Sequence, residues 1–319
     1  MGEDNLQKQE ASLESNNIPK ILRYAAIDIG SNAIRLLLCN VVYEHDEPHF
    51  KKSELIRIPL RLGEDVFNNG RVSYQKMQKF FKTMAAFKLL MEVFDPVAYR
   101  ACATASLRDA LNGEEMVKLV KRDYGMKIEI ISGREEADLI FSNHVEERLN
   151  KNQSYLYIDV GGGSTELTLF SEGRSLVSQS FDIGTIRWLQ NKVIKEKWNE
   201  FKDFVRTITH HRQPLTAIGS GGNINKIFKI LGRKDSQSLS FGKIKELYSE
   251  LKSHTIEERM EIWKLNPDRA DVIVPAAKIF LSVMKAGEIE EIIIPQIGLV
   301  DGIVHELHEK NKLQYRVSA

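Results

Sequence analysis

Residues 24–42 read YAAIDIGSNAIRLLLCNVV, and residues 155–170 read YLYIDVGGGSTELTLF. In both stretches, two runs rich in aliphatic and β-branched residues flank a short turn rich in glycine and serine, which is typical of a β-hairpin with a tight loop. Asp159 follows its counterpart Asp28 by 131 positions. That spacing is a domain length, longer than the period of roughly 20–50 residues in a solenoid. The sequence therefore predicts two related domains.

Strand-like and helix-like patterns alternate along the rest of the chain. Residues 74–94 carry methionine and phenylalanine at helical spacing behind Ser73, a suitable N-cap. Residues 55–73 are predicted to form a basic loop. Further strands are expected at residues 97–104, 127–132 and 291–295, and further helices at 106–124, 185–194, 198–210 and 271–287, from about Arg134 and from about Asp301. This alternation predicts the α/β class.

The composition excludes several classes of protein. The chain has 319 residues, with 45 Lys+Arg against 44 Asp+Glu and a formal net charge of +1. This balance gives no overall field that would gather nucleic acid or an anionic membrane, so an anionic ligand must be held by a local site. No apolar run approaches the roughly 20 residues that cross a bilayer, and the polar residues 1–20 do not resemble a signal peptide. We expect a flexible N-terminal tail over residues 1–20 and a cytoplasmic protein.

Cys39 and Cys102 are the two cysteines of the chain. Both stand among apolar or small residues, and they lack the close spacing of metal-binding cysteines. We therefore expect two buried thiols in a reducing compartment and no disulfide framework.

The two hairpin turns are predicted to bind phosphate. Glycines let successive backbone N–H groups point into one concavity, and the neighbouring hydroxyl and amide side chains add donors. Asp28 and Asp159, at the ends of the incoming strands, would repel phosphate unless a divalent cation lay between them, and Mg²⁺ takes carboxylate and phosphate oxygens together. One such turn is compatible with an ordinary hairpin, whereas two at matching positions favour a phosphate site. The candidate residues of the turns are Gly30, Ser31, Asn32, Gly161, Gly162, Gly163, Ser164 and Thr165.

Seven stretches carry a family resemblance. In order, DIGSNAIRLLL, ATASLRDALN, ISGREEADLIF, IDVGGGSTEL, AIGSGGNINKI, RADVIVPAAKIF and IGLVDG resemble the motifs of the Ppx/GppA family of exopolyphosphatases and guanosine pentaphosphate phosphohydrolases. The resemblance covers about residues 24–307, and it is to the short form, which lacks the HD-type C-terminal domains. It implies an actin-like ATPase (ASKHA) fold, with two ribonuclease-H-like domains and an active site in the cleft between them. Domain I is then expected at residues 21–140, completed by a C-terminal helix at 303–319, and domain II at 141–302.

The resemblance also implies roles for the carboxylates. Glu136, the second glutamate of GREEA, becomes the catalytic residue that orients or deprotonates the attacking water, with Glu135 as the alternative. A carboxylate suits that task, although glutamate in the first turn of a helix is also commonly placed there by the helix dipole. Asp159 and Glu166 become the acids linked to Mg²⁺ or Mn²⁺, and Asp28 is a third candidate for the metal.

Basic residues near these motifs are candidates for holding phosphate. Arg108 and Arg35 lead, because the guanidinium fork matches phosphate geometry. Arg35 could instead pair with a nearby acid, and Arg61 is a third candidate. The third glycine-rich turn, Gly219, Gly221 and Gly222, is expected to shape the cleft.

The leading functional prediction is hydrolysis of terminal phosphoanhydride bonds of inorganic polyphosphate, with release of orthophosphate. The alternative is removal of the 5′-terminal phosphate of guanosine pentaphosphate (pppGpp), since one site serves both within the family. A non-hydrolytic nucleotide-binding regulator on the same fold is a third interpretation, which Glu136 argues against. The resemblance implies a homodimer, and no nucleic-acid or membrane partner is expected. Two departures from the family pattern, Ala33 for serine and Val300 for a basic residue, bear on how a long polyanion is held.

Overall fold

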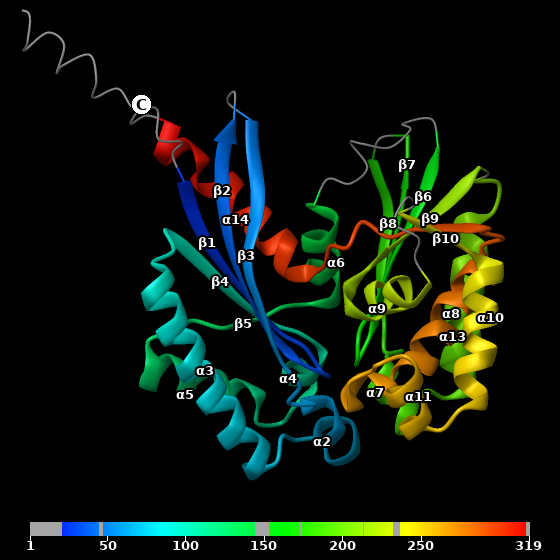
Figure 1. Cartoon of the computed structure of the whole chain (residues 1–319), viewed down its shortest axis with the longest axis horizontal. Helices are drawn as coiled ribbons and strands as arrows, with labels where there is room; N and C mark the ends of the chain where they lie inside the picture. The colour runs from blue at the N-terminus through cyan, green and yellow to red at the C-terminus, as the bar shows by residue number, and fades with distance from the viewer. Residues whose placement is uncertain are drawn as a thin grey trace, which may run out of the picture.

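The computed structural model describes residues 21–44, 47–143, 153–172, 174–212, 214–231 and 237–316. Two α/β lobes lie side by side, each built on one twisted sheet (Figure 1). The first lobe holds a five-stranded sheet in the order β3-β2-β1-β4-β5, and the second a six-stranded sheet in the order β10-β11-β9-β6-β7-β8. The strands of the first sheet are β1 (Ile21–Ile29), β2 (Ile34–Glu44), β3 (Glu47–Ile58), β4 (Ala98–Ala103) and β5 (Glu129–Ile130). Those of the second are β6 (Ser154–Val160), β7 (Thr165–Ser171), β8 (Arg174–Phe181), β9 (Leu215–Ser220), β10 (Ser238–Ser240) and β11 (Glu291–Ile293).

The two sheets repeat one topology. In each, three antiparallel strands (β1-β2-β3 or β6-β7-β8) are followed by parallel strands on the other side of the first (β4 and β5, or β9 and β11). Strand β10 extends the second sheet, antiparallel to β11. This is the arrangement of two ribonuclease-H-like domains of the actin-like ATPase type. The predicted α/β class and the predicted duplication are therefore confirmed.

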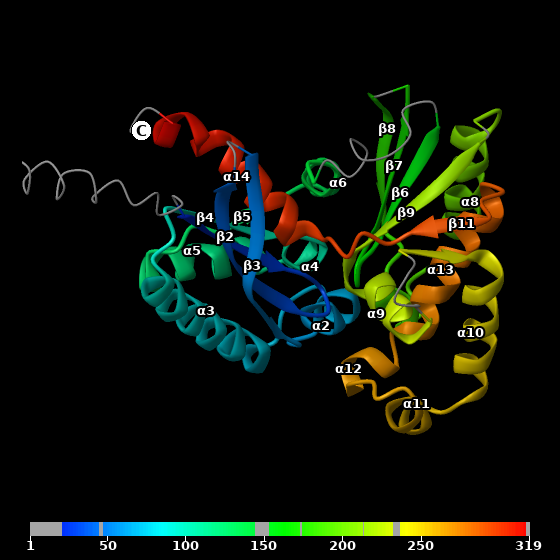
Figure 2. The same cartoon turned by 45° about the horizontal axis from the view of Figure 1, so that its top comes forward.

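Helices bury both faces of the first sheet, so β1 is almost continuously apolar. Its residues Ala25, Ile27 and Ile29 join the core beneath α3, while the alternate residues Tyr24 and Ala26 face α14. The helices of this lobe are α2 (Leu62–Asn69), α3 (Tyr74–Phe94), α4 (Ala105–Asp109), α5 (Gly113–Tyr124), α6 (Gly133–Phe141) and α14 (Leu299–Arg316). The segment between β11 and α14 crosses from the second lobe to the first (Figure 2).

The second lobe has one large core beneath its helices. The largest fully buried side chains there include Phe201 of α8 and Phe280 of α13. The helices of this lobe are α7 (Thr185–Leu189), α8 (Lys195–Thr209), α9 (Gly221–Leu231), α10 (Phe241–Ser253), α11 (Ile256–Ile262), α12 (Pro267–Ala270) and α13 (Ile273–Ala286). Ile186 of α7 and Val272 pack into the core of the first lobe, so the two lobes share apolar contacts.

Two predicted elements were wrong. The expected basic loop at residues 55–73 is instead the end of β3 followed by α2. The single helix expected at residues 106–124 is two helices, because the chain turns at Asn112, whose amide group bonds both backbone polar groups of Val72. A Cβ on Gly113 would lie 2.1 Å from the carbonyl oxygen of Leu107, so this tight turn requires glycine.

The remaining predictions concern helix α3, the two cysteines, membrane spans and the N-terminal tail. Helix α3 has the predicted bounds, and the Ser73 hydroxyl accepts its capping hydrogen bond from Lys76 N. Cys39 and Cys102 are buried free thiols, as expected. No helix in the described ranges has the length and hydropathy of a membrane span. The predicted tail at residues 1–20 lies outside the described residues.

Candidate active site

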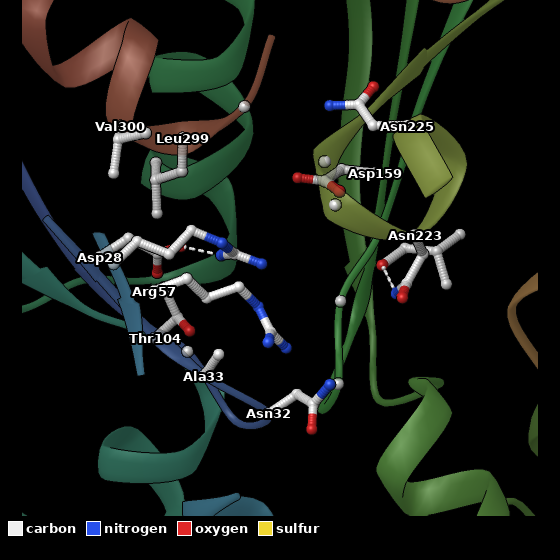
Figure 3. A pocket seen from close by; sticks show the side chains of 18 of the residues that line it. Asp28, Asn32, Ala33, Arg57, Thr104, Asp159, Asn223, Asn225, Leu299 and Val300 are labelled. Carbon is white, nitrogen blue, oxygen red and sulfur yellow. Dashed lines mark hydrogen bonds and ion pairs between the residues drawn. The ribbon is translucent and has the colours of Figure 1, made fainter. Parts of the chain in front are cut away.

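A cavity of about 490 Å³ lies between the two lobes. On the first-lobe side, Figure 3 shows Asp28, Arg57 and Thr104, with Asn32 reaching toward the second lobe. Asp159, Asn223 and Asn225 line the opposite side, and Leu299 and Val300 at the start of α14 line the upper left of the view. The cavity is thus built by the strand ends and turns that the duplicated motif brings together.

The two glycine-rich turns are alike, and they meet across the interface. Gly30 N donates to Ala33 O at 3.2 Å, and Gly161 N donates to Ser164 O at 2.9 Å. A Cβ on Gly162 would lie 3.0 Å from Ser31 Cβ, so glycine permits this close approach. The predicted phosphate residues that line the cavity are Gly30, Ser31, Asn32, Gly161, Gly162, Gly163 and Ser164.

Thr165, the remaining residue predicted in the turns, does not line the cavity. Its hydroxyl donates to the carbonyl oxygen of Ile183 at 2.5 Å, inside the second lobe. The third glycine-rich turn is only partly in the cavity lining, because Gly221 and Gly222 line it and Gly219 does not. Gly221 has a φ of +84°, and a Cβ there would lie 2.3 Å from Asp159 Oδ1.

The strand-ending aspartates have different cross-strand partners. Asp28 is opposite Arg35, with which it forms an ion pair, whereas Asp159 is opposite Glu166. Burial raises the pKa of Asp28 in spite of the Arg35 charge. Burial also raises the pKa of Asp159 to about 6, and burial together with the Asp159 charge raises the pKa of Glu166 to about 7. Ser180 Oγ donates to Glu166 Oε1 at 2.8 Å. The second lobe thus holds two carboxylates that repel each other.

Glu136 lies in the first turn of α6, behind the N-cap Ser132, and it lines the cavity. It is 9% exposed, and its Oε2 atom is buried without a hydrogen-bond partner among the described residues. Burial raises its pKa well above the usual range, and the charges of Glu166, Asp28 and Asp159 add to that rise. Glu135, the alternative, instead pairs with Arg100 at 2.6 Å and does not line the cavity. Of the two glutamates, Glu136 is therefore the one that faces the cavity.

The predicted arginines occupy three different settings. Arg35 pairs with Asp28, as the alternative prediction had it, and it also lines the cavity, so its contact with phosphate stays a prediction. Arg108 does not line the cavity, and its Nη1 atom donates to Ile131 O at 3.0 Å; its charge lowers the pKa of Glu136 against the effect of burial. Arg61 pairs with Glu64 and Asp271 outside the cavity lining.

Five further basic residues line the cavity without having been predicted there. They are Lys52 and Arg57 of β3, Lys226 and Lys229 of α9, and Arg269 of α12. Arg57 pairs with Asp268. Arg269 Nη1 donates to Asn223 Oδ1 at 3.1 Å, and burial together with the charges of Arg57 and Arg35 lowers the pKa of Arg269 to about 9. Arg269 stands in the RADVIVPAAKIF stretch, so its sequence context carried a signal. Arg57 lies within the loop expected at residues 55–73, and no prediction covers Lys52.

The carboxylates do not form a closed metal site by themselves. Among the described residues, no group of three or more histidine, cysteine, aspartate or glutamate side chains is arranged to hold one ion. Asp28 is already paired with Arg35. Asp159 and Glu166 remain as directly opposed neighbours, and Mg²⁺ commonly takes one or two carboxylates and completes its shell with phosphate and water oxygens. Oxygen ligands of this kind suit a hard divalent cation, and of the two acids Asp159 lines the cavity whereas the buried Glu166 does not.

An actin-like fold with two glycine-rich turns and a buried carboxylate at the cavity between the lobes is typical of enzymes that act on phosphoanhydrides. The model of the Ppx/GppA phosphatase family matches residues 41–311, and the chain belongs to that family. Phosphatases of this family generally depend on a divalent metal.

Curated relatives and solved structures agree with this assignment. The chain is 24% identical over 298 residues to a guanosine-5′-triphosphate,3′-diphosphate pyrophosphatase of Vibrio parahaemolyticus, a match that covers 89% of this chain and 59% of the relative. An exopolyphosphatase from Cytophaga hutchinsonii superposes with a TM-score of 0.78 at 22% identity, over 90% of this chain and 98% of that one. A Ppx/GppA family member from Aquifex aeolicus gives 0.72 at 24% identity, over 92% and 99%. The two structures show the shared fold, and the chain spans about three fifths of the length of the curated relative.

Proposed function

We propose that this chain hydrolyses the terminal phosphoanhydride bond of inorganic polyphosphate and releases orthophosphate. The observation that carries the proposal is the placement of Glu136, a buried carboxylate that lines the cavity between the two glycine-rich turns and whose Oε2 atom has no hydrogen-bond partner among the described residues. Family membership supports the reaction class.

The binding step uses the donors of the cavity. The turns at residues 31–32 and 162–164 line the cavity from both lobes, and their backbone N–H groups are the donors proposed for one phosphate group. Two guanidinium groups converge nearby, since a Cβ on Gly222 would lie 2.6 Å from Arg269 Nη2 and 3.2 Å from Arg35 Nη2. A phosphate anion there relieves the repulsion between these cations, a repulsion that adds to the effect of burial in lowering the pKa of Arg269.

Glu136 then accepts a proton from the attacking water. Burial and the neighbouring acidic charges raise its pKa, which makes the carboxylate a stronger base. A divalent cation held by Asp159 and Glu166 would neutralise charge between these acids and the substrate; Mg²⁺ and Mn²⁺ are the candidates. Most of the acceleration comes from positioning and from stabilisation of charge on the transferred group.

Guanosine pentaphosphate is the second candidate substrate, because curated relatives carry the name guanosine-5′-triphosphate,3′-diphosphate pyrophosphatase. Parallel phosphate-release assays with polyphosphate, pppGpp and ATP, each with Mg²⁺ and with EDTA, decide between them. We expect the highest kcat/KM with polyphosphate and loss of activity in EDTA. Turnover of ATP alone, or of none of the three, would overturn the proposal, and a higher kcat/KM with pppGpp would favour the second candidate.

Two smaller proposals accompany the reaction. We infer a homodimer from the family resemblance, which a size measurement in solution tests. We also infer that the protein works in the cytoplasm, a reducing compartment, because Cys39 and Cys102 are buried free thiols and burial raises the pKa of each to about 12.

A further inference from the structure

One stripe of helix α9 faces the cavity. Gly222, Asn225, Lys226 and Lys229 line it, and their spacing of i, i+3, i+4 and i+7 places them along one side of a helix. Ile224 and Ile227, on the other side, are fully buried in the second lobe. At a rise of 1.5 Å per residue, the stripe runs for about 10 Å away from the convergence of Arg35 and Arg269 at Gly222.

The cations of this stripe lack acidic partners. Lys52, Arg57 and Arg35, on the first-lobe side, pair with Asp301, Asp268 and Asp28, respectively. In the part of the chain that the structure describes, no carboxylate forms an ion pair with Lys226, Lys229 or Arg269. Burial lowers the pKa of Lys226, and the charges of Lys229 and Arg269 lower it further, so like charges gather here. Such a row of unmatched cations on a cavity wall is suited to a chain of anionic groups.

The residues that line the cavity also indicate which kind of anion it binds. No phenylalanine, tyrosine, tryptophan or histidine is among the described residues that line the cavity, so it offers no aromatic surface on which a base would stack. Asn225 adds a polar amide to the lining, and an amide –NH2 group can donate to a phosphate oxygen. The lining therefore favours an inorganic phosphate chain over a nucleoside.

We propose that Asn225, Lys226 and Lys229, the α9 stripe, bind the phosphate groups that trail behind the reacting one in a linear polyphosphate. This proposal rests on the proposed function, and it assigns to the second lobe the part of the site that recognises chain length. A short substrate fills the turns alone, whereas a longer one also reaches the lysines. The stripe thereby makes the enzyme selective for long chains.

The test is the K226Q/K229Q double variant of the full chain. We expect its ratio of kcat/KM for long-chain polyphosphate to kcat/KM for tripolyphosphate to fall roughly threefold to tenfold, as two partly screened charge contacts are lost. The matched control is K245Q/K252Q, which removes two charges from exposed positions of α10. The control ratio should stay at the wild-type value, and both variants should keep the wild-type melting temperature.

The outcomes separate the two proposals. An unchanged ratio in K226Q/K229Q, with wild-type protein active on both substrates, would overturn the role of the stripe and leave the proposed function standing. A fall in kcat/KM confined to pppGpp would also overturn it, because the trailing group would then belong to a nucleotide. If the wild-type protein released no phosphate from either polyphosphate, the proposed function itself would fail, and the stripe's role with it.

Discussion

Arg35 and Glu166 occupy the same position in the two halves of the duplicated fold, with opposite charge. Each lies directly across a hairpin from the strand-ending aspartate of its lobe, so Asp28 faces a cation and Asp159 faces a second carboxylate. The first pair is an internal ion pair, and the second is a pair of buried carboxylates that repel each other. The same hairpin geometry thus holds opposite charges in one lobe and like charges in the other.

Stability should therefore depend on the ionisation of Glu166. Its pKa is about 7 in the folded protein and about 4.5 when unfolded, so the folded state holds the proton more tightly. Ionisation of Glu166 alone should lower the free energy of unfolding without metal by roughly 2–3 kcal/mol as the pH rises from 4.5 to 7. The other buried acids of the cavity lower it in the same direction, so the fall in E166Q should be smaller than that in wild type by about this amount. Urea unfolding across this pH range measures it, with E200Q on the exposed face of α8 as the control. A pH dependence in E166Q equal to that of wild type would contradict the assignment.

Removing Arg35 should destabilise the first lobe. In R35Q, the buried carboxylate of Asp28 loses its partner, and breaking a buried ion pair from one side costs about 3 kcal/mol. The loss should grow as the pH rises through the raised pKa of Asp28, because wild type then gains from the pair and the variant holds a buried charge without its partner. Chemical denaturation provides the measurement. K79Q, an exposed change on α3, should cost less than about 0.5 kcal/mol. An R35Q loss as small as that of K79Q would show that the pair contributes nothing.

Gly221 should tolerate no side chain. G221A forces a Cβ to within 2.3 Å of Asp159 Oδ1 at a φ of +84°, so the aspartate or the turn must move. We expect a drop in kcat of at least about tenfold, since displacement of a positioned group by about 1 Å can cost a hundredfold. G242A is the control, because its Cβ would meet nothing closer than 4.0 Å. Wild-type kcat in G221A would mean that Asp159 has no positional role.

Local sequence signals predicted much of the fold and of the site. The hairpins, the phosphate-type turns and the first-turn position of Glu136 follow from short motifs, because each depends on residues that are close together in the chain. The structure adds that Glu136 faces the cavity and Glu135 faces Arg100, a distinction that depends on how α6 packs between the lobes.

The basic residues that line the cavity could not be predicted from short motifs. Strand β3 is an edge strand with mostly exposed residues, so its sequence lacks the apolar–polar alternation of a half-buried strand. Arg57 therefore falls within the loop expected at residues 55–73. Arg57 is opposite Arg35 only through strand pairing, and Arg269 reaches both only through tertiary packing. A charge cluster formed by residues that are far apart in the sequence has no short motif by which it could be predicted.

The central claim is that Glu136 is the general base, and the E136Q variant tests it most directly. With polyphosphate and Mg²⁺, kcat should fall by roughly 10²–10⁴-fold while substrate binding and the melting temperature stay near wild type. E135Q is the matched control, one residue away with its carboxylate on Arg100, and it should keep kcat within a few-fold of wild type. A fall in kcat for E135Q with near-normal turnover by E136Q would contradict the account.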